Sequence, residues 1–370
     1  MKMIHGMDIS SMDEVVRLGG RFYDKGEEKD LIQILKSYGV NYVRLRLWMN
    51  PYGVNGKAYG AGCNDLDATV RMAEKVKAAG MKYLLDFHYS DFWTDPGKQI
   101  KPKAWKEYGE EELEAALYEY TKDTLFFLKE KNCLPDMVQV GNEITNGMLW
   151  PEGHCRKFER LTRFINAGIR GVRKADKTIP VMLHLDQGNR QELYREWFDN
   201  YQKYGGEDFE IIGLSYYPVW NGGLKGLTDN MNVLADRYGK EMIVAEVSQP
   251  FTMEDYGSYE GLAPEERKGY AAKPENTGAL EYPATAEGQC AFMERFLEEL
   301  GKVKGGLGSG YFYWEPAWLP VKGSGWATKE SLRYMDDPGP CGNEWANQGL
   351  FDYKGNALPA LEVIRRFAAM

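Results

Sequence analysis

The stretch Met137–Glu143 reads MVQVGNE, an apolar run that ends on an ionisable side chain. Met242–Glu246, which reads MIVAE, repeats this pattern further along the chain. Short apolar runs of this kind are typical of strands in a buried parallel sheet. A carboxyl group at the end of such a strand is costly to desolvate unless it is paired, solvated or functional. The two runs therefore predict two buried strands, each carrying a glutamate to a site of interest.

Further apolar runs extend this pattern over the whole chain. They alternate with longer segments of helical period, and Gly39 and Gly80 stand where the left-handed caps of the first two helices are expected. The alternation predicts an α/β fold, a (β/α)8 TIM barrel. We expect one domain over residues 1–370, with long loops after strands 7 and 8 at 249–287 and 322–347. The predicted strands are Ile4–Asp8, Tyr42–Trp48, Tyr83–His88, Met137–Glu143, Pro180–Leu185, Ile211–Tyr217, Met242–Glu246 and Tyr311–Trp314.

Composition limits the class of partner. The net charge of -9 argues against nucleic acid, and no apolar run of about 18 residues predicts a membrane span. The five cysteines form an odd set without CxxC spacing, so we expect free thiols. The first residues lack the apolar core of a secretory signal, so we expect a cytoplasmic protein, or a secreted one if a leader precedes this start. We expect a monomer.

Paired carboxyl groups have a well-known use in cleaving glycosidic bonds. One carboxylic acid protonates the leaving oxygen, while a second carboxylate attacks the sugar or activates water. Glu143 and Glu246 could supply both groups, although a single strand-end glutamate more often forms a salt bridge. Aromatic residues make up 13% of the chain, and rings beside Gly, Pro or Asp suit stacking against sugar faces. Most aromatic rings in a protein of this size fill its core.

Nearly every predicted strand ends on polar or aromatic side chains. Catalytic residues of a TIM barrel stand at the C-terminal strand ends and in the following loops. Because folding alone does not explain so many polar groups on one rim, we interpret the rim as a carbohydrate cleft. Besides the two glutamates it carries Asp8, Arg44, Arg46, Asp86, His88, His184, Asp186, Tyr216, Tyr217, Trp314 and Glu315.

Four blocks resemble a known family. They are Asn41–Pro51 (NYVRLRLWMNP), Asp86–Gln99 (DFHYSDFWTDPGKQ), Gln139–Pro151 (QVGNEITNGMLWP) and Tyr313–Trp318 (YWEPAW). Together they resemble glycoside hydrolase family 53, the endo-β-1,4-galactanases, and they span nearly the whole chain in the expected order. The resemblance implies retaining hydrolysis of β-1,4-galactan, which occurs in the type I arabinogalactan of pectin.

The resemblance also implies roles for single residues. Glu143 would be the acid/base and Glu246 the nucleophile, with Asn142 bound to the sugar 2-hydroxyl. Arg46 would lie near the nucleophile, although Arg44 is the alternative, and Tyr216 would hold its carboxylate. Trp314 would form the floor of the cleavage subsite.

The remaining candidates differ in their expected roles. Trp93 and Trp318 lie in loops beside Gly or Pro and are expected to be sugar platforms. His88, His184 and Asp186 lie on the rim and are expected to bind substrate. Glu315 points opposite to Trp314 by strand alternation, so a structural role is expected.

No metal or other cofactor is expected. The chain has no HExxH motif and no Cys/His cluster, and the glycine-rich run Gly305–Gly310 precedes a strand instead of opening a helix. Some bacterial galactanases that resemble this chain hold calcium in the loop after the seventh strand. The corresponding stretch, Met253–Gly261, keeps few of the six to eight oxygen ligands that calcium takes, so we expect the site to be absent.

The sequence is also compatible with two alternative functions. The same mechanism could act on another polysaccharide, such as glucan, mannan or xylan. The barrel could also bind carbohydrate without cleaving it, although such a module gains nothing from a matched acid and nucleophile.

Overall fold

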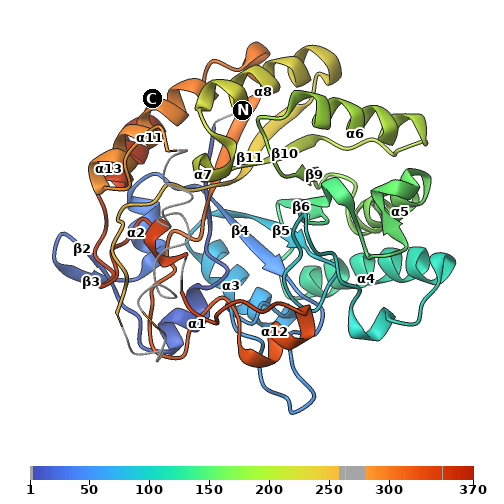
Figure 1. Cartoon of the computed structure of the whole chain (residues 1–370), viewed down its shortest axis with the longest axis horizontal. Helices are drawn as coiled ribbons and strands as arrows, with labels where there is room; N and C mark the ends of the chain where they lie inside the picture. Colours follow the sequence, from blue (N-terminus) through green and yellow to red (C-terminus); the bar gives the residue numbers. More distant parts are fainter. Residues whose placement is uncertain (1–2, 258–262, 264–279, 344) are drawn as a thin grey trace.

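The computed structural model describes residues 3–257, 263, 280–343 and 345–370 (Figure 1). Within these residues eight parallel strands close into a barrel, in the order β1-β12-β11-β10-β9-β6-β5-β4. They are β1 (Ile4–Asp8), β4 (Tyr42–Leu47), β5 (Lys82–Phe87), β6 (Met137–Val140), β9 (Val181–Leu185), β10 (Ile211–Tyr216), β11 (Glu241–Val247) and β12 (Gly308–Trp314). The predicted (β/α)8 barrel is confirmed, and each predicted strand is present with only its ends shifted.

A helix follows each barrel strand and lies on the outside of the barrel (Figure 1). These are α2 (Leu31–Ser37), α3 (Leu66–Ala78), α4 (Glu110–Glu130), α5 (Phe158–Ala175), α6 (Gln191–Lys203), α8 (Leu224–Tyr238), α11 (Ala286–Leu300) and α13 (Ala360–Ala368). Shorter elements lie in the loops: α1 (Met12–Arg17), β2 (Phe22–Asp24), β3 (Glu27–Lys29), η1 (Lys103–Trp105), η2 (Ile144–Asn146), β7 (Gly147–Met148), β8 (Gly153–His154), η3 (Cys155–Lys157), α7 (Pro218–Asn221), η5 (Lys304–Gly306), α12 (Lys329–Met335) and η6 (Ala346–Gln348).

Local sequence signals set where the helices begin and end. The Asp65 carboxylate caps α3 by accepting a hydrogen bond from the Ala68 N–H. The two glycines expected at helix ends follow α2 and α3 with positive φ, 87° at Gly39 and 71° at Gly80. Both helices therefore turn back to the next strand where the sequence predicts.

The barrel interior is divided into an apolar and a polar layer. Because side chains alternate along a strand, Tyr42, Arg44 and Arg46 of β4 all point inward, while Val43 and Leu45 face the helices. The polar side chains lie at the C-terminal ends of the strands, so the fold places them under the loops. The apolar layer consists of Ile4, Tyr42, Leu84, Met137, Met182, Ile211, Ile243, Ala245 and Phe312.

The loops after β11 and β12 are long, as predicted, and they contact each other. The first runs over 248–285, of which 258–262 and 264–279 lie outside the described residues. The second runs over 315–359 and contains α12 and η6. The Phe251 N–H donates to the Asn347 carbonyl at 2.9 Å, which joins the two loops. Among the described residues, every helix is too short or too polar to cross a bilayer.

Candidate active site

A cavity of about 740 Å³ opens at the C-terminal ends of the barrel strands, a volume within the usual range for a small-molecule site. Residues from several strands and from their following loops line it, which is the arrangement of TIM-barrel active sites. Its lining includes Arg44, Arg46, His88, Trp93, Asp95, Lys98, Asn142, Glu143, Asp186, Ser215, Tyr217, Trp220, Glu246, Trp314, Trp326, Asp337 and Trp345. We refer to this cavity as the cleft.

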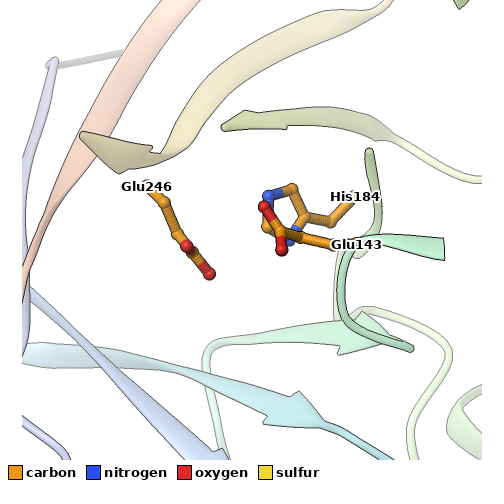
Figure 2. Close-up of side chains that lie close together, drawn as sticks. All are labelled: Glu143, His184 and Glu246. Atoms are coloured by element: carbon orange, nitrogen blue, oxygen red, sulfur yellow. The ribbon is translucent and has the colours of Figure 1, made fainter. Parts of the chain in front are cut away.

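The two glutamates face each other across the cleft (Figure 2). One carboxylate oxygen of Glu143, one of Glu246 and one ring nitrogen of His184 lie within 4.8 Å of one another. A retaining pair stands about 5 to 5.5 Å apart, whereas an inverting pair needs about 6.5 to 9.5 Å to admit water. The spacing therefore suits direct attack of a carboxylate on a sugar.

Glu143 does not belong to the strand that precedes it. β6 ends at Val140, and Glu143 has a left-handed backbone with φ 46° and ψ 52°. Such a conformation costs a non-glycine residue about 1 to 3 kcal/mol, and the surrounding structure must hold it. The Gln99 side chain contributes by donating to the Asn142 carbonyl at 2.8 Å. This turn directs the Glu143 carboxyl over the mouth of the barrel.

A β-bulge gives Glu246 its direction. In the pairing of β10 with β11, Leu214 lies opposite Val244 and Ser215 opposite Glu246, so Ala245 is an extra residue. Without it, strict alternation would place Glu246 on the outer face, because Ala245 already packs in the apolar layer of the interior. The bulge therefore allows two consecutive residues to face inward.

Glu246 is held by a cation and by a hydroxyl. Arg44 Nη1 lies 3.0 Å from Oε1, and the Tyr217 hydroxyl donates to Oε2 at 2.7 Å. Burial raises the pKa of Glu246 above its ordinary value, and Arg44 and Tyr217 oppose that rise. Arg44 is itself buried against Asp8 and Asp86 at 2.9 and 2.8 Å. Two hydrogen-bond donors thus favour the ionised form that a nucleophile needs.

Two predicted contacts of Glu246 are corrected. Tyr216 points away from the cleft, and its hydroxyl donates to the Gly222 carbonyl. The reason is strand parity: Ser215 and Tyr217 point inward, so Tyr216 faces outward. Arg46 lines the cleft but pairs with Glu315 at 2.6 Å, so Arg44 is the arginine on Glu246.

Glu143 lies in surroundings that favour its protonated form. Burial, the charge of Glu246 and the charge of Asp186 raise the pKa of Glu143 well above its ordinary value. The Ser215 hydroxyl, which donates to Glu143 Oε1 at 2.6 Å, acts in the opposite direction. Two carboxyl groups at this spacing do not ionise together easily, and of these two glutamates Arg44 pairs with Glu246. The proton therefore favours Glu143.

Asn142 and His88 line the cleft while being fixed by protein partners. Asn142 Oδ1 accepts from Arg44 Nη2 at 2.8 Å, and its Nδ2 donates to the Thr94 carbonyl at 2.9 Å. An amide nitrogen has two N–H groups, so one remains for a ligand. His88 contacts Thr94 through Nδ1 and Asp86 through Nε2, at 2.9 and 3.1 Å.

The structure places His184 behind the cleft. It is fully buried, Nε2 contacts Ser215 Oγ at 2.8 Å, and Nδ1 lies 3.1 Å from Gln139 Nε2. His184, unlike His88, does not line the cleft, so the predicted contact of His184 with substrate is corrected. Asp186 does line the cleft, where its carboxylate accepts from Gln187 Nε2 at 2.9 Å.

The predicted aromatic residues divide into exposed and supporting rings. Trp93 and Trp314 line the cleft, whereas Trp318 is only 2% exposed and is not part of its wall. Trp318 stacks against Trp93 with a 9° angle between the rings, and its Nε1 donates to Asn343 Oδ1 at 2.6 Å. The prediction that Trp318 is a sugar platform is therefore corrected, because its neighbours cover it.

Tyr217 was predicted on the rim, whereas several other cleft residues were not predicted from the sequence. Ser215 could have been found from strand parity, since it alternates with Gly213 on β10. Trp220, Trp326 and Trp345 come from loops, where no periodicity indicates the direction of a side chain. Glu315 binds Arg46 and the Ser11 hydroxyl below the cleft, as its predicted structural role requires.

Among the described residues, one cluster has the composition of a metal site: Glu143, His184 and Glu246. Its atoms already have partners, because Arg44 pairs with Glu246 and Ser215 bridges His184 to Glu143. A guanidinium at 3.0 Å also repels a second cation. The predicted calcium stretch lies partly outside the described residues, since 258–261 are not among them.

Comparison with known proteins gives a consistent result. The model of Glycosyl hydrolase family 53 matches residues 4–364. An endo-beta-1,4-galactanase of Bacillus subtilis is 36% identical over 98% of this chain and 85% of its own length. An arabinogalactan endo-beta-1,4-galactanase of Cellvibrio japonicus is 35% identical over 96% of this chain and 88% of its own. The solved Ignisphaera aggregans GH53 catalytic domain superposes with a TM-score of 0.90 at 37% identity, covering 98% of this chain and 96% of that one. The chain belongs to glycosyl hydrolase family 53.

Proposed function

We propose that this protein is an endo-β-1,4-galactanase that hydrolyses the galactan of type I arabinogalactan with retention of configuration. One observation supports it above all others: Glu143 and Glu246 present carboxylate oxygens within 4.8 Å of each other in one cleft. The family and the galactanases of similar sequence supply the linkage and the sugar. A matched carboxyl pair also argues for an enzyme over a non-catalytic binding protein.

The proposed reaction has two displacement steps. In the first, Glu246 attacks the anomeric carbon, the bond to the 4-oxygen of the leaving sugar breaks, and the Glu143 proton passes to that oxygen. In the second, Glu143 takes a proton from water, whose oxygen attacks the anomeric carbon and releases Glu246. Arg44 and Tyr217 keep Glu246 ionised at the start. The free Asn142 N–H binds the 2-hydroxyl, and Trp314 forms the floor of the subsite.

The other wall residues would set substrate binding. We assign Trp93 as a sugar platform and Asp186, His88 and Arg46 to the polar wall of the cleft. We also propose one catalytic domain over 1–370, working as a monomer on a polysaccharide, without a metal, nucleic acid or membrane partner. The acidic net charge of -9 supports the exclusion of nucleic acid.

Incubation with linear galactan tests the proposal directly. We expect short galactooligosaccharides early in the time course, with proton NMR showing the β-anomer first. Glu246→Ala should abolish the release, because no other carboxylate replaces the nucleophile. Glu241→Ala is the matched control, since Glu241 starts the same strand at the far end of the barrel and accepts from Ser309. We expect that control to keep its activity.

The same assay separates the alternatives. Cleavage of glucan, mannan or xylan without cleavage of galactan would keep the mechanism and contradict the substrate. Binding of galactan without any turnover would contradict the enzyme itself. Full activity of the Glu246→Ala variant would contradict the assigned nucleophile.

A further inference from the structure

A chain of buried hydrogen bonds reaches Glu143 from the side away from the cleft. It starts at Gln139 on β6, passes through His184 on β9 and ends at Ser215 on β10. The distances are 3.1 Å from Gln139 Nε2 to His184 Nδ1, 2.8 Å from His184 Nε2 to Ser215 Oγ, and 2.6 Å from Ser215 Oγ to Glu143 Oε1. Gln139 and His184 are fully buried, and Ser215 is 2% exposed.

The direction of the hydrogen bonds in this chain depends on His184 Nδ1, which lies 3.1 Å from Gln139 Nε2 and 3.2 Å from Asn142 Oδ1. Arg44 Nε donates to Gln139 Oε1 at 3.3 Å, which leaves Gln139 Nε2 as the group facing His184. Gln139 Nε2 only donates, and Asn142 Oδ1 already accepts from Arg44 Nη2 at 2.8 Å, so we assign His184 Nδ1 as an acceptor. Burial, with Arg44 and His88 nearby, lowers the pKa of His184 well below its ordinary value, so its ring is neutral and carries its hydrogen on Nε2. His184 therefore donates to Ser215, whose single hydrogen points to Glu143.

This direction has a consequence for the acid. Glu143 Oε1 accepts from Ser215 and cannot carry the acid proton without bringing two hydrogens together. Among the described residues no hydrogen bond reaches Glu143 Oε2, which leaves it for a ligand. We propose that Ser215, oriented by His184, is a positioning residue that confines the acid proton of Glu143 to Oε2, the oxygen that serves the leaving group.

The inference rests on the proposed glycosidase function and deepens it. General acid catalysis contributes about 10²- to 10⁴-fold to a rate, and it requires the proton on the correct oxygen. Without the Ser215 hydroxyl, the carboxyl can rotate and can place its proton on either oxygen. We expect Ser215→Ala to lower kcat on galactan about 10-fold, as part of that contribution, with little change in KM.

The test compares leaving groups, because good leaving groups need no proton. A series of aryl glycosides, made on the sugar that the wild type cleaves, is measured as kcat/KM, which reports the first displacement. Ser215→Ala should lose rate on poor leaving groups and keep it on dinitrophenol, so its dependence on leaving-group pKa should become steeper. Ser248→Ala is the control: this serine is also fully buried, at the end of β11, and donates to Gln348.

Two further measurements separate positioning from a structural role. When Glu143→Ala is already present, adding Ser215→Ala should lower the rate no further, because Glu143 is the residue through which Ser215 acts. The protein has 4 histidines, and the signals that disappear in the His184→Asn variant identify those of His184 in the nitrogen NMR spectrum. These signals should show that His184 carries its hydrogen on Nε2. Equal losses for all leaving groups, a further loss in the double variant, or a hydrogen on Nδ1 would each overturn the inference. Failure to cleave galactan would instead contradict the proposed function.

Discussion

Glu143 and Glu246 are the same amino acid, and their neighbours give them different chemistry. Glu246 has Arg44 at 3.0 Å and the Tyr217 hydroxyl at 2.7 Å, both of which stabilise a negative charge. Glu143 has one hydroxyl donor and two carboxylates nearby, and burial raises its pKa further. One residue is therefore prepared to attack and the other to donate a proton.

The Glu143→Gln variant should be more stable than the wild type at neutral and high pH. Because the pKa of Glu143 is raised in the folded state, its proton stabilises the fold at low pH, and that contribution is lost as the pH rises through the folded pKa. Glutamine cannot ionise and still accepts from Ser215. We expect a gain of about 1 kcal/mol in the free energy of unfolding at pH 8.

Denaturant unfolding of both proteins at pH 8 and pH 4 measures this difference. The gain should shrink at pH 4, where the wild type is also protonated. An equal gain at both values would show that ionisation is not its cause.

Tyr217→Phe should shift the acid limb of the kcat/KM profile to higher pH. Its hydroxyl stabilises ionised Glu246, so removing it raises the pKa of Glu246, which must be ionised to react. A hydrogen bond to a charged group contributes about 1.5 to 3 kcal/mol, so we expect a shift of about one pH unit. Tyr216→Phe is the matched control, because that hydroxyl bonds the Gly222 carbonyl. A shift in the Tyr216 variant alone would show that the structure assigns the wrong tyrosine.

At the scale of elements, loops following different strands build the cleft wall together. The loop after β5 and the loop after β12 meet where Trp93 Nε1 donates to the Trp326 carbonyl at 2.8 Å. Lys98 and Asp337 add a contact between the same loops at 3.7 Å. Trp93 is also stacked on Trp318, so its ring has little freedom. The platform is therefore fixed before substrate arrives.

Trp93→Phe should weaken binding of galactan more than it slows the chemical step. The smaller ring loses both stacking area and the hydrogen bond to Trp326, which is worth about 0.5 to 1.5 kcal/mol. We expect KM on galactan to rise about 2- to 10-fold with kcat nearly unchanged. Trp105→Phe serves as the control, because Trp105 is buried outside the cleft. A fall in kcat at constant KM would contradict a platform role.

At the scale of the whole molecule, one half of the barrel interior stabilises the fold and the other half carries the reactive groups. The apolar layer fills its N-terminal half, and the charged network of Asp8, Arg44, Asp86 and Glu246 occupies the C-terminal half. Arg44, the arginine of this network, is paired with all three carboxylates, because an unpaired buried charge would be strongly destabilising. We propose that this network needs no metal ion to hold it in place.

Chelation tests this last point. Treatment with EDTA should leave the melting temperature and the galactan activity unchanged, since Arg44 already pairs with Glu246 and the stretch 253–261 offers few calcium ligands. A large fall in melting temperature, reversed by added calcium, would show a calcium site and contradict the proposal.

The sequence alone determined the barrel, its strands and the two glutamates. The spacing of apolar residues is a local property of the sequence, so a strand or helix can be recognised without knowing what it contacts. The pattern also places the end of each strand to within a few residues, although β6 ends at Val140, and this is why Glu143 and Glu246 could be placed on one rim.

Only the tertiary structure decided which neighbour serves each glutamate. The bulge at Ala245 directs Glu246 inward, and it depends on the register between β10 and β11. Arg44 and Arg46 share the same strand face, so their different partners follow from the positions of Asp86 and Glu315 on other strands. Hydrogen bonds of this kind join residues far apart in the chain, and no local pattern carries that information.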